Sequence, residues 1–145
     1  MAIEGVALYH ARLANDSVVS PRSLARMAEE LPRAAELIAP SLGLAAIGYA
    51  CTSGATIIGE TRVAEILARI HPGVPCTNPL TAAKAALAAL GAARVGLVTP
   101  YTPDVTLAMQ ANFSAAGIDV PVVGSFYEDK DLEVGKINEA SILDA

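Results

Sequence analysis

A single cysteine separates an apolar run from a stretch of hydroxyl residues and glycine. Residues 44–50 are mostly apolar, and Cys51, Thr52, Ser53 and Gly54 follow directly. This pattern predicts a strand that passes through a turn into a helix, which places the thiol at the carboxyl end of the strand. In open α/β sheets, ligands bind at that end. Cys51 is therefore the candidate nucleophile or base of a catalytic site.

The chemistry open to this turn depends on the state of the thiol. The positive end of a helix dipole favours the thiolate form of a nearby cysteine. The backbone amides of Thr52, Ser53 and Gly54 could hold a carboxylate or a developing oxyanion. These groups suit removal of a proton next to a carboxylate, or addition to an activated double bond. The alternative is an inert cysteine, which spacing alone favours because free cysteine is among the most buried residue types.

Two further strand-to-helix junctions carry polar side chains. Thr77 and Asn78 follow Cys76 and are candidates to face the same cleft, although Asn78 could instead cap the helix that begins at Pro79. Cys76 is interpreted as a small residue that fills a strand end. Tyr101 lies at the third junction. Its phenol could donate a hydrogen bond to a carboxylate or enolate oxygen, or it could pack against a loop.

The sequence does not indicate a metal or phosphate site. His10 and His71 are the only histidines, and His71, at a helix end before Pro72, is predicted to lie at the surface. Paired histidines, a Cys-x-x-Cys motif and an acidic cluster are all absent from the sequence. A glycine-rich phosphate motif is absent as well. We therefore expect no bound metal and no glycine-rich phosphate site.

The composition restricts the class of partner. The 145 residues are 53% hydrophobic, which suffices for one ordinary core, and the net charge of −5 without a Lys/Arg cluster argues against nucleic acid. Apolar stretches end well short of about 18 residues, so we predict no membrane span. No signal-peptide pattern opens the sequence. The two cysteines are expected to be free thiols in a reducing, cytoplasmic compartment.

The elements that must position these residues alternate along the chain. Strands are predicted at 6–13, 44–51, 74–77, 94–99 and 118–123. Helices are predicted at 20–31 with a second piece at 33–38, and at 55–70, 79–90 and 104–116, before a charged tail that ends as the start of a helix. The apolar strand 94–99 is expected to be covered on both faces.

This alternation predicts a doubly wound, parallel α/β sheet. We place a boundary near Ala92, between a first α/β lobe over 1–92 and the start of a second lobe over 93–145. The first predicted strand has nothing but a few residues before it, and the last helix has no strand after it. We therefore expect a fragment of a longer fold, whose exposed sheet edges would favour a homodimer.

Three stretches resemble the aspartate/glutamate racemase superfamily. They are YACTSGATIIGE (Tyr49–Glu60), TNPLTAAKAALAALGA (Thr77–Ala92) and RVGLVTPYTPDV (Arg94–Val105). Within that superfamily they are most similar to the branch that holds maleate cis-trans isomerases, arylmalonate decarboxylases and the racemase-like proteins of ectoine utilisation. The resemblance runs from about Val6 to the C-terminus.

The resemblance implies two similar α/β lobes with the active site between them, no cofactor and a small carboxylic acid as the substrate. It implies that Cys51 is the first catalytic cysteine, that Thr52 and Ser53 bind the substrate carboxylate or stabilise an enolate, and that Tyr101 donates a hydrogen bond from the second lobe. The decarboxylases of this branch carry glycine where Cys51 stands. Cysteine here favours isomerase or racemase chemistry.

The sequence also departs from the family pattern. The family's second catalytic cysteine lies in a later segment, and its asparagine-containing loop lies on an opening strand; neither is found in this sequence. Cys76 lies in the first lobe and is not the second catalytic thiol. We expect a cofactor-independent cis-trans isomerase of the maleate type or an amino-acid racemase. The alternatives are a catalytically incomplete fragment, a carboxylate-binding remnant or an enzyme like the arylmalonate decarboxylases.

Overall fold

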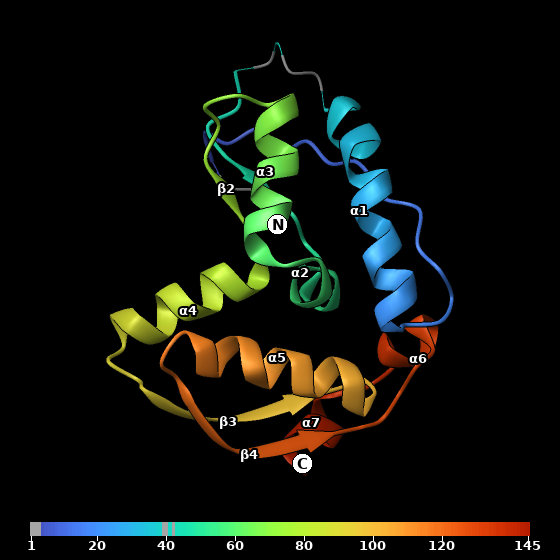
Figure 1. Ribbon diagram of the computed structural model, residues 1–145, viewed down its shortest axis with the longest axis vertical. Helices are drawn as coiled ribbons and strands as arrows, with labels where there is room; N and C mark the ends of the chain where they lie inside the picture. Colours follow the sequence, from blue (N-terminus) through green and yellow to red (C-terminus); the bar gives the residue numbers. More distant parts are fainter. Residues whose placement is uncertain (1–3, 39–40, 42) are drawn as a thin grey trace.

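The computed structural model describes residues 4–38, 41 and 43–145 as a mixed α/β chain (Figure 1). Its elements follow in the order α1 (Pro21–Glu36), β1 (Ile47–Gly48), α2 (Thr52–Ile58), α3 (Glu60–Ile70), β2 (Cys76–Thr77), α4 (Pro79–Ala89), β3 (Arg94–Thr99), α5 (Pro103–Ala115), β4 (Asp119–Ser125), α6 (Asp131–Val134) and α7 (Glu139–Leu143). Helices and strands alternate over most of the chain, as the sequence predicts.

The strands of the described residues pair in parallel. β1 pairs with β2, so that Ile47 lies opposite Cys76. β3 pairs with β4, with Thr99 opposite Ser125 and an irregularity between Arg94 and Gly96. β1 and β2 are joined through α2 and α3, and β3 and β4 through α5, as parallel strands need a crossover connection. The predicted α/β class with parallel strands is therefore confirmed.

The helices begin where local signals predict. Ser20 and Ser23 form a reciprocal capping box, in which Ser20 Oγ accepts from the Ser23 amide at 3.2 Å and Ser23 Oγ accepts from the Ser20 amide at 3.0 Å. The predicted break at Pro32 is wrong, because α1 is continuous through it. Leu31 and Ala35, on either side of Pro32, both pack into the core. That burial offsets the cost of a proline inside a helix, about 3 kcal/mol.

The core lies between α1, α2 and α3, and it continues beneath α5. Its first part is built around Leu24, Met27, Tyr49 and Val63, all buried. The second part is formed by α5 and β4; its buried side chains are Val105, Met109, Phe113 and Val120. α2 contacts both α1 and α5, so the helix after Cys51 joins the two parts.

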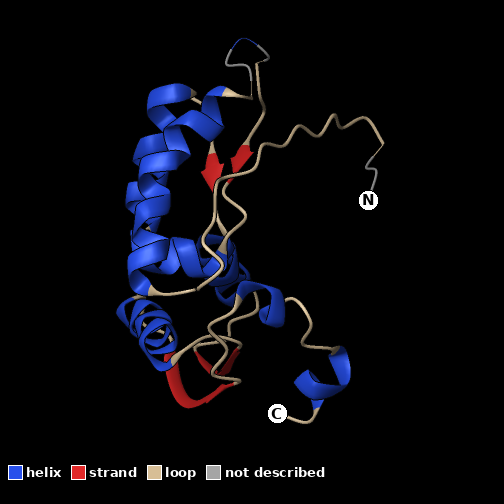
Figure 2. Ribbon diagram, turned by 90° about the vertical axis from the view of Figure 1, so that its right-hand side faces the viewer, coloured by secondary structure: helices blue, strands red, loops and turns tan. Residues whose placement is uncertain are grey.

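The predicted strand over residues 6–13 is wrong. The segment is extended but is assigned to no sheet, and Val6, Leu8 and Tyr9 are exposed. A strand requires a ladder of hydrogen bonds to a neighbour, and the described backbone bonds supply none here. Figure 2 shows the N-terminal segment as a loop that leaves the body of the molecule. β1 and β2 are also shorter than predicted, with two residues each.

The expectation that both faces of β3 are covered is wrong as well. Figure 1 shows α5 lying along one side of the β3–β4 pair. On the strands, Val98 is 48% exposed and Val122 is 67% exposed. Although β3 is apolar, one face of the β3–β4 pair is thus uncovered in the described chain. No helix in the described ranges is long and apolar enough to cross a membrane.

Candidate active site

Cys51 caps the helix that it precedes. Its backbone is extended, and its sulfur accepts a hydrogen bond from the Gly54 amide at 3.3 Å. The Ser53 hydroxyl lies 3.7 Å from the same sulfur. Cys51 is partly buried, at the edge of the core. The predicted arrangement of strand end, thiol and helix start is therefore present in the structure.

The helix after this turn is shorter than predicted. The expected helix over 55–70 is two helices, α2 and α3, which meet at Gly59. Gly59 has φ 91°, a conformation that side chains disfavour. It ends α2 and begins α3. The thiol thus lies at the start of a helix of only two turns. The side chains around the sulfur are therefore expected to contribute more to its state than the dipole of this short helix.

The turn after β3 brings Tyr101 to the Cys51 turn. The Tyr101 phenol lies close enough to Ser53, Thr52 and Cys51 for all three to affect its pKa. Burial raises the pKa of Tyr101; the Ser53 hydroxyl opposes that rise, and a negative charge on Cys51 adds to it. The net pKa is raised, so the phenol stays neutral and can donate a hydrogen bond. Three predicted site residues and Cys51 therefore meet at one place.

Hydroxyl groups hold the backbone of Tyr101 in position. Ser125 Oγ donates to the Tyr101 carbonyl, and Thr106 Oγ1 donates to the same oxygen at 3.3 Å. Thr99 Oγ1 lies 2.7 Å from Thr106 Oγ1, inside the core. These bonds link the ends of β3 and β4 to the first turn of α5. No sequence pattern marks these residues, because isolated Ser and Thr residues carry no recognisable spacing.

The junction at Thr77 and Asn78 lies beside the Cys51 turn, but Asn78 is used to cap α4. Asn78 is 4% exposed, and its Oδ1 accepts from the amides of Leu80 and Thr81, both at 3.1 Å. Its amide group donates to Thr81 Oγ1 at 2.9 Å. Asn78 therefore serves as the helix cap that was one of its two predicted roles. Thr77 pairs with Gly48 across the strands and is exposed. Burial raises the pKa of the Cys76 thiol.

A cavity of about 430 Å³ opens on the other side of Cys51. Its walls are the extended segment 9–13, the apolar face of α1 and the backbone of β1. Cys51 lines this cavity, whereas Thr52, Ser53 and Tyr101 do not. The sulfur therefore lies between a cavity and the hydroxyl groups of the Tyr101 turn.

The prediction that His71 lies at the surface is wrong. His71 is 2% exposed, and its Nε2 lies 2.9 Å from the carbonyl oxygen of Ala35. The end of α3 packs against the end of α1, so the ring reaches a carbonyl of another helix rather than water. His71 Nδ1 is buried without a partner among the described residues. No group of acidic, His or Cys side chains in the described ranges could hold a metal.

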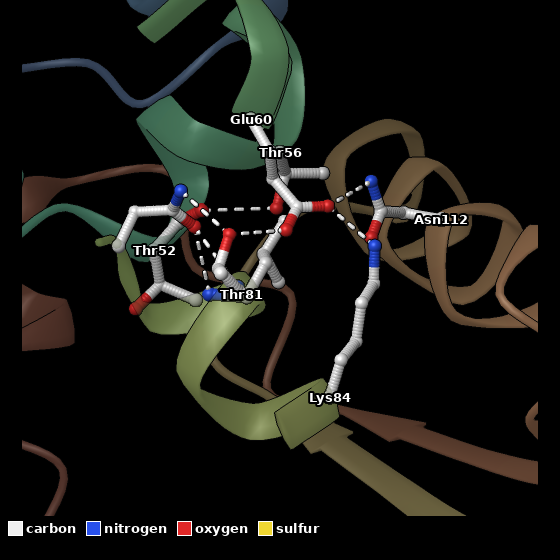
Figure 3. Close-up of polar contacts among 8 residues, drawn as sticks. Thr52, Thr56, Glu60, Thr81, Lys84 and Asn112 are labelled. Atoms are coloured by element: carbon white, nitrogen blue, oxygen red, sulfur yellow. Dashed lines mark hydrogen bonds and ion pairs between the residues drawn. The ribbon is translucent and has the colours of Figure 1, made fainter. Parts of the chain in front are cut away.

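Glu60 is the centre of a polar cluster that no motif in the sequence predicts. Its carboxylate pairs with the Lys84 ammonium and accepts from Thr81 Oγ1 and from Asn112 Nδ2, at 3.4 Å for Asn112 (Figure 3). Burial alone would raise the pKa of Glu60, but hydrogen bonds from Lys84 and Thr81 outweigh it and lower the pKa. The cluster connects α3, α4 and α5 close to Thr52 and Thr56 of α2.

No protein-family model matches the chain, and no curated protein matches it. Solved structures do match. The C194S mutant of Nocardia farcinica maleate cis-trans isomerase, with a covalently bound succinylcysteine intermediate, gives a TM-score of 0.84 at 28% identity. The match covers 99% of this chain and 61% of that one. The described chain thus spans less than two thirds of that enzyme's length.

Two further structures extend the comparison. The maleate isomerase Iso of Pseudomonas putida S16 gives a TM-score of 0.76 at 23% identity, covering 90% of this chain and 56% of its own. The Gly74Cys-Cys188Ser mutant of arylmalonate decarboxylase gives a TM-score of 0.75 at 24% identity. That match covers 88% of this chain and 55% of the decarboxylase. These neighbours belong to the aspartate/glutamate racemase superfamily, and the chain has its fold. The expected link to ectoine utilisation stays a prediction.

Proposed function

We propose that this chain carries cofactor-independent isomerase chemistry on a small unsaturated dicarboxylic acid, with cis-trans isomerisation of maleate as the reaction. The observation that carries the proposal is the position of Cys51. Its sulfur lies 3.7 Å from the Ser53 hydroxyl, and the Tyr101 phenol lies close enough to Ser53 and Cys51 for both to affect its pKa. A nucleophile and neutral donors for a carboxylate are therefore adjacent.

The reaction follows from these groups. The Cys51 thiolate forms a carbon–sulfur bond to one carbon of the double bond, and the π electrons move onto the other carbon and its carboxylate. The former double bond is then single and can rotate. When the electrons return, the double bond re-forms in the trans geometry and the thiolate leaves. Proton donors near the carboxylate stabilise the charged intermediate, which is the role proposed for Tyr101, Thr52 and Ser53.

The likeness to the succinylcysteine-bearing isomerase supports this route over the alternatives. The arrangement of the site is consistent with it, because Cys51 follows β1 and Tyr101 follows β3. We further propose that residues 1–92 and 93–145 are two lobes with the site at their junction; residues 1–3, 39–40 and 42 of the first lobe lie outside the described ranges. Racemisation would need a second thiol opposite Cys51, and Cys76 lies on the strand beside it instead.

The test is incubation of the purified protein with maleate, followed by NMR detection of fumarate. Aspartate, glutamate and phenylmalonate are assayed in parallel, so that racemisation and decarboxylation are separate outcomes. Cys51→Ala is expected to abolish turnover, and Cys76→Ala is the matched control and is expected to retain it. Mass spectrometry of the quenched reaction is expected to find one maleate-derived adduct, on the peptide that contains Cys51.

Two results would contradict the proposal. The first is turnover of maleate that persists unchanged in Cys51→Ala, because another group would then carry the reaction. The second is carboxylate binding, measured by calorimetry, with no turnover of any substrate by the wild-type chain. That outcome would favour the carboxylate-binding remnant over the enzyme.

A further inference from the structure

Tyr49 places a buried phenol beside the proposed nucleophile. The side chain is 5% exposed, and its hydroxyl donates to the Met27 sulfur at 3.8 Å. The space between this hydroxyl and Cys51 exists because residue 54 is glycine. A Cβ at Gly54 would lie 2.2 Å from the Tyr49 hydroxyl oxygen and 3.0 Å from the Cys51 sulfur. The phenol oxygen and the sulfur therefore converge on one point.

The Tyr49 phenol keeps its proton over the range in which a thiol ionises. Burial raises the pKa of Tyr49 above its usual value, and the negative charge of Cys51 raises it further. A raised phenol pKa means that the O–H group is present at neutral and moderately alkaline pH. Tyr49 is therefore available as a donor whenever the sulfur carries a charge.

The Met27 thioether and the Cys51 thiolate are unequal acceptors. A thioether sulfur is a weak acceptor, whereas a hydrogen bond to an ionised group is about twice as strong as one between neutral groups. Rotation about the bond between the phenol ring and its oxygen turns the O–H group away from the Met27 sulfur and toward the side of Cys51. The ring itself is held in place by the core.

We propose that Tyr49 is a positioning residue for Cys51: its O–H group turns from the Met27 sulfur to the Cys51 sulfur when the thiol ionises, and it stabilises the thiolate. It thereby adds a third donor to the Gly54 amide and the Ser53 hydroxyl, which already lie at the sulfur. Its significance for catalysis rests on the proposed function, whereas its effect on thiol reactivity does not. Tyr49 itself does not touch the substrate in this role.

Other titratable groups also face the region of the sulfur. Tyr101 approaches from the turn before α5, and Tyr9, His10, Arg12 and Asp131 line the cavity on the opposite side. A change at Tyr49 leaves these five groups in place. A shift in thiol reactivity that is confined to the Tyr49 variant is therefore attributable to the loss of its hydroxyl.

The experiment measures the rate of iodoacetamide alkylation of Cys51 as a function of pH, in a Cys76→Ala background so that one thiol reacts. Tyr49→Phe keeps the ring and removes the hydroxyl. Its pH midpoint is expected to move upward by about one unit, with a roughly tenfold lower alkylation rate at neutral pH, the size expected for loss of a charge-assisted hydrogen bond. Tyr127→Phe is the matched control, because Tyr127 is 69% exposed, and its curve is expected to be unchanged.

A folded Tyr49→Phe protein with an unchanged midpoint would overturn the inference. Met27→Leu gives an independent test, because it removes the competing acceptor and nearly preserves volume. Its midpoint is expected to move downward, and a midpoint that stays or rises would also overturn the inference. Alkylation requires no turnover, so the two proposals fail separately. Maleate turnover that depends on Cys51, with no effect of Tyr49→Phe, would remove only the role of Tyr49.

Discussion

The carboxylate of Glu60 forms an ion pair with the Lys84 ammonium at the place where α3, α4 and α5 meet (Figure 3). The Asn112 amide of α5 donates to the same carboxylate at 3.4 Å. α3 directly follows the short helix that begins after Cys51, and α5 begins after Tyr101. One acidic side chain thus connects the helices that carry the two sides of the proposed site.

Glu60→Gln is expected to lower the free energy of unfolding. The side chains of Glu60 and Lys84 are only 20% and 23% exposed. In the variant the Lys84 ammonium therefore remains partly buried without its charged partner. We expect a loss of about 1–3 kcal/mol in denaturant melts at pH 7. Glu65→Gln is the matched control, because Glu65 pairs with Arg62 at the surface with 53% exposure. Its effect is expected to stay within about 0.5 kcal/mol.

The effect of Glu60→Gln depends on pH with a defined sign. The pKa of Glu60 is lowered below its usual value of 4.5 in the folded chain. Its contribution is therefore complete above the unfolded pKa and is lost as the pH falls through the folded pKa. The stability difference between wild type and Glu60→Gln should shrink as the pH is lowered below about 4.5. A difference that stays constant over that range would contradict the assigned ion pair.

Gly54→Ala is expected to disturb both Tyr49 and Cys51. The added Cβ would meet the buried Tyr49 hydroxyl oxygen at 2.2 Å. Alanine favours a helix by about 1 kcal/mol over glycine, but overpacking of a core costs about 1–3 kcal/mol. We expect a net loss of stability in thermal melts, together with slower alkylation of Cys51. Gly96→Ala has open space around its Cβ and should retain both properties. Unchanged melting of Gly54→Ala would show that Tyr49 can move aside.

Tyr101→Phe is expected to reduce kcat/KM for maleate by roughly ten- to a hundredfold, the cost of one hydrogen bond to a charged group. The pKa of Tyr101 is raised above its usual value of 10.0, so the phenol remains a donor throughout the neutral range. The ratio of wild-type to variant kcat/KM should therefore be constant between about pH 6 and 9. A ratio that falls toward one as the pH rises would mean that the phenol ionises within this range.

His71→Phe is expected to lower the free energy of unfolding by about 1–2 kcal/mol, because the hydrogen bond to Ala35 is lost and a larger ring enters a buried site. His71→Ala adds a cavity and should cost about 2–4 kcal/mol. His10→Ala is the control for a histidine that is exposed, and it should fall within about 0.5 kcal/mol. Equal stability of all three variants would contradict the structural role of the buried ring. Urea melts at pH 8 measure the series.

Many helix ends could be predicted from the sequence because the signals are local. Ser20 and Asn78 cap α1 and α4 by bonds that reach only two or three residues along the chain. Gly91 and Gly117 have positive φ, at 65° and 81°, where they follow α4 and α5. A glycine in that conformation ends a helix without reference to the rest of the fold. The thiol before α2 was predictable for the same reason.

The strands were less predictable because a strand needs a neighbour. Residues 6–13 have the composition of a strand, yet the described chain offers them no ladder, and they lie in the structure as an extended loop. β3 has the apolar sequence of a doubly covered strand but is covered by α5 on one side. In both cases the residue pattern indicates only that the segment can adopt an extended conformation. Pairing and coverage depend on segments elsewhere in the fold.

The sequence by itself determined Cys51, its hydroxyl neighbours and the turn that holds them, since these lie within a few residues of one another. Only the tertiary structure decided that Tyr101 lies near Ser53, that the Tyr49 hydroxyl and the Cys51 sulfur both border Gly54, and that His71 is buried. The physical reason is that these contacts depend on how α2 packs against α1 and α5. Packing at native density selects which distant side chains touch, and no local pattern encodes that choice.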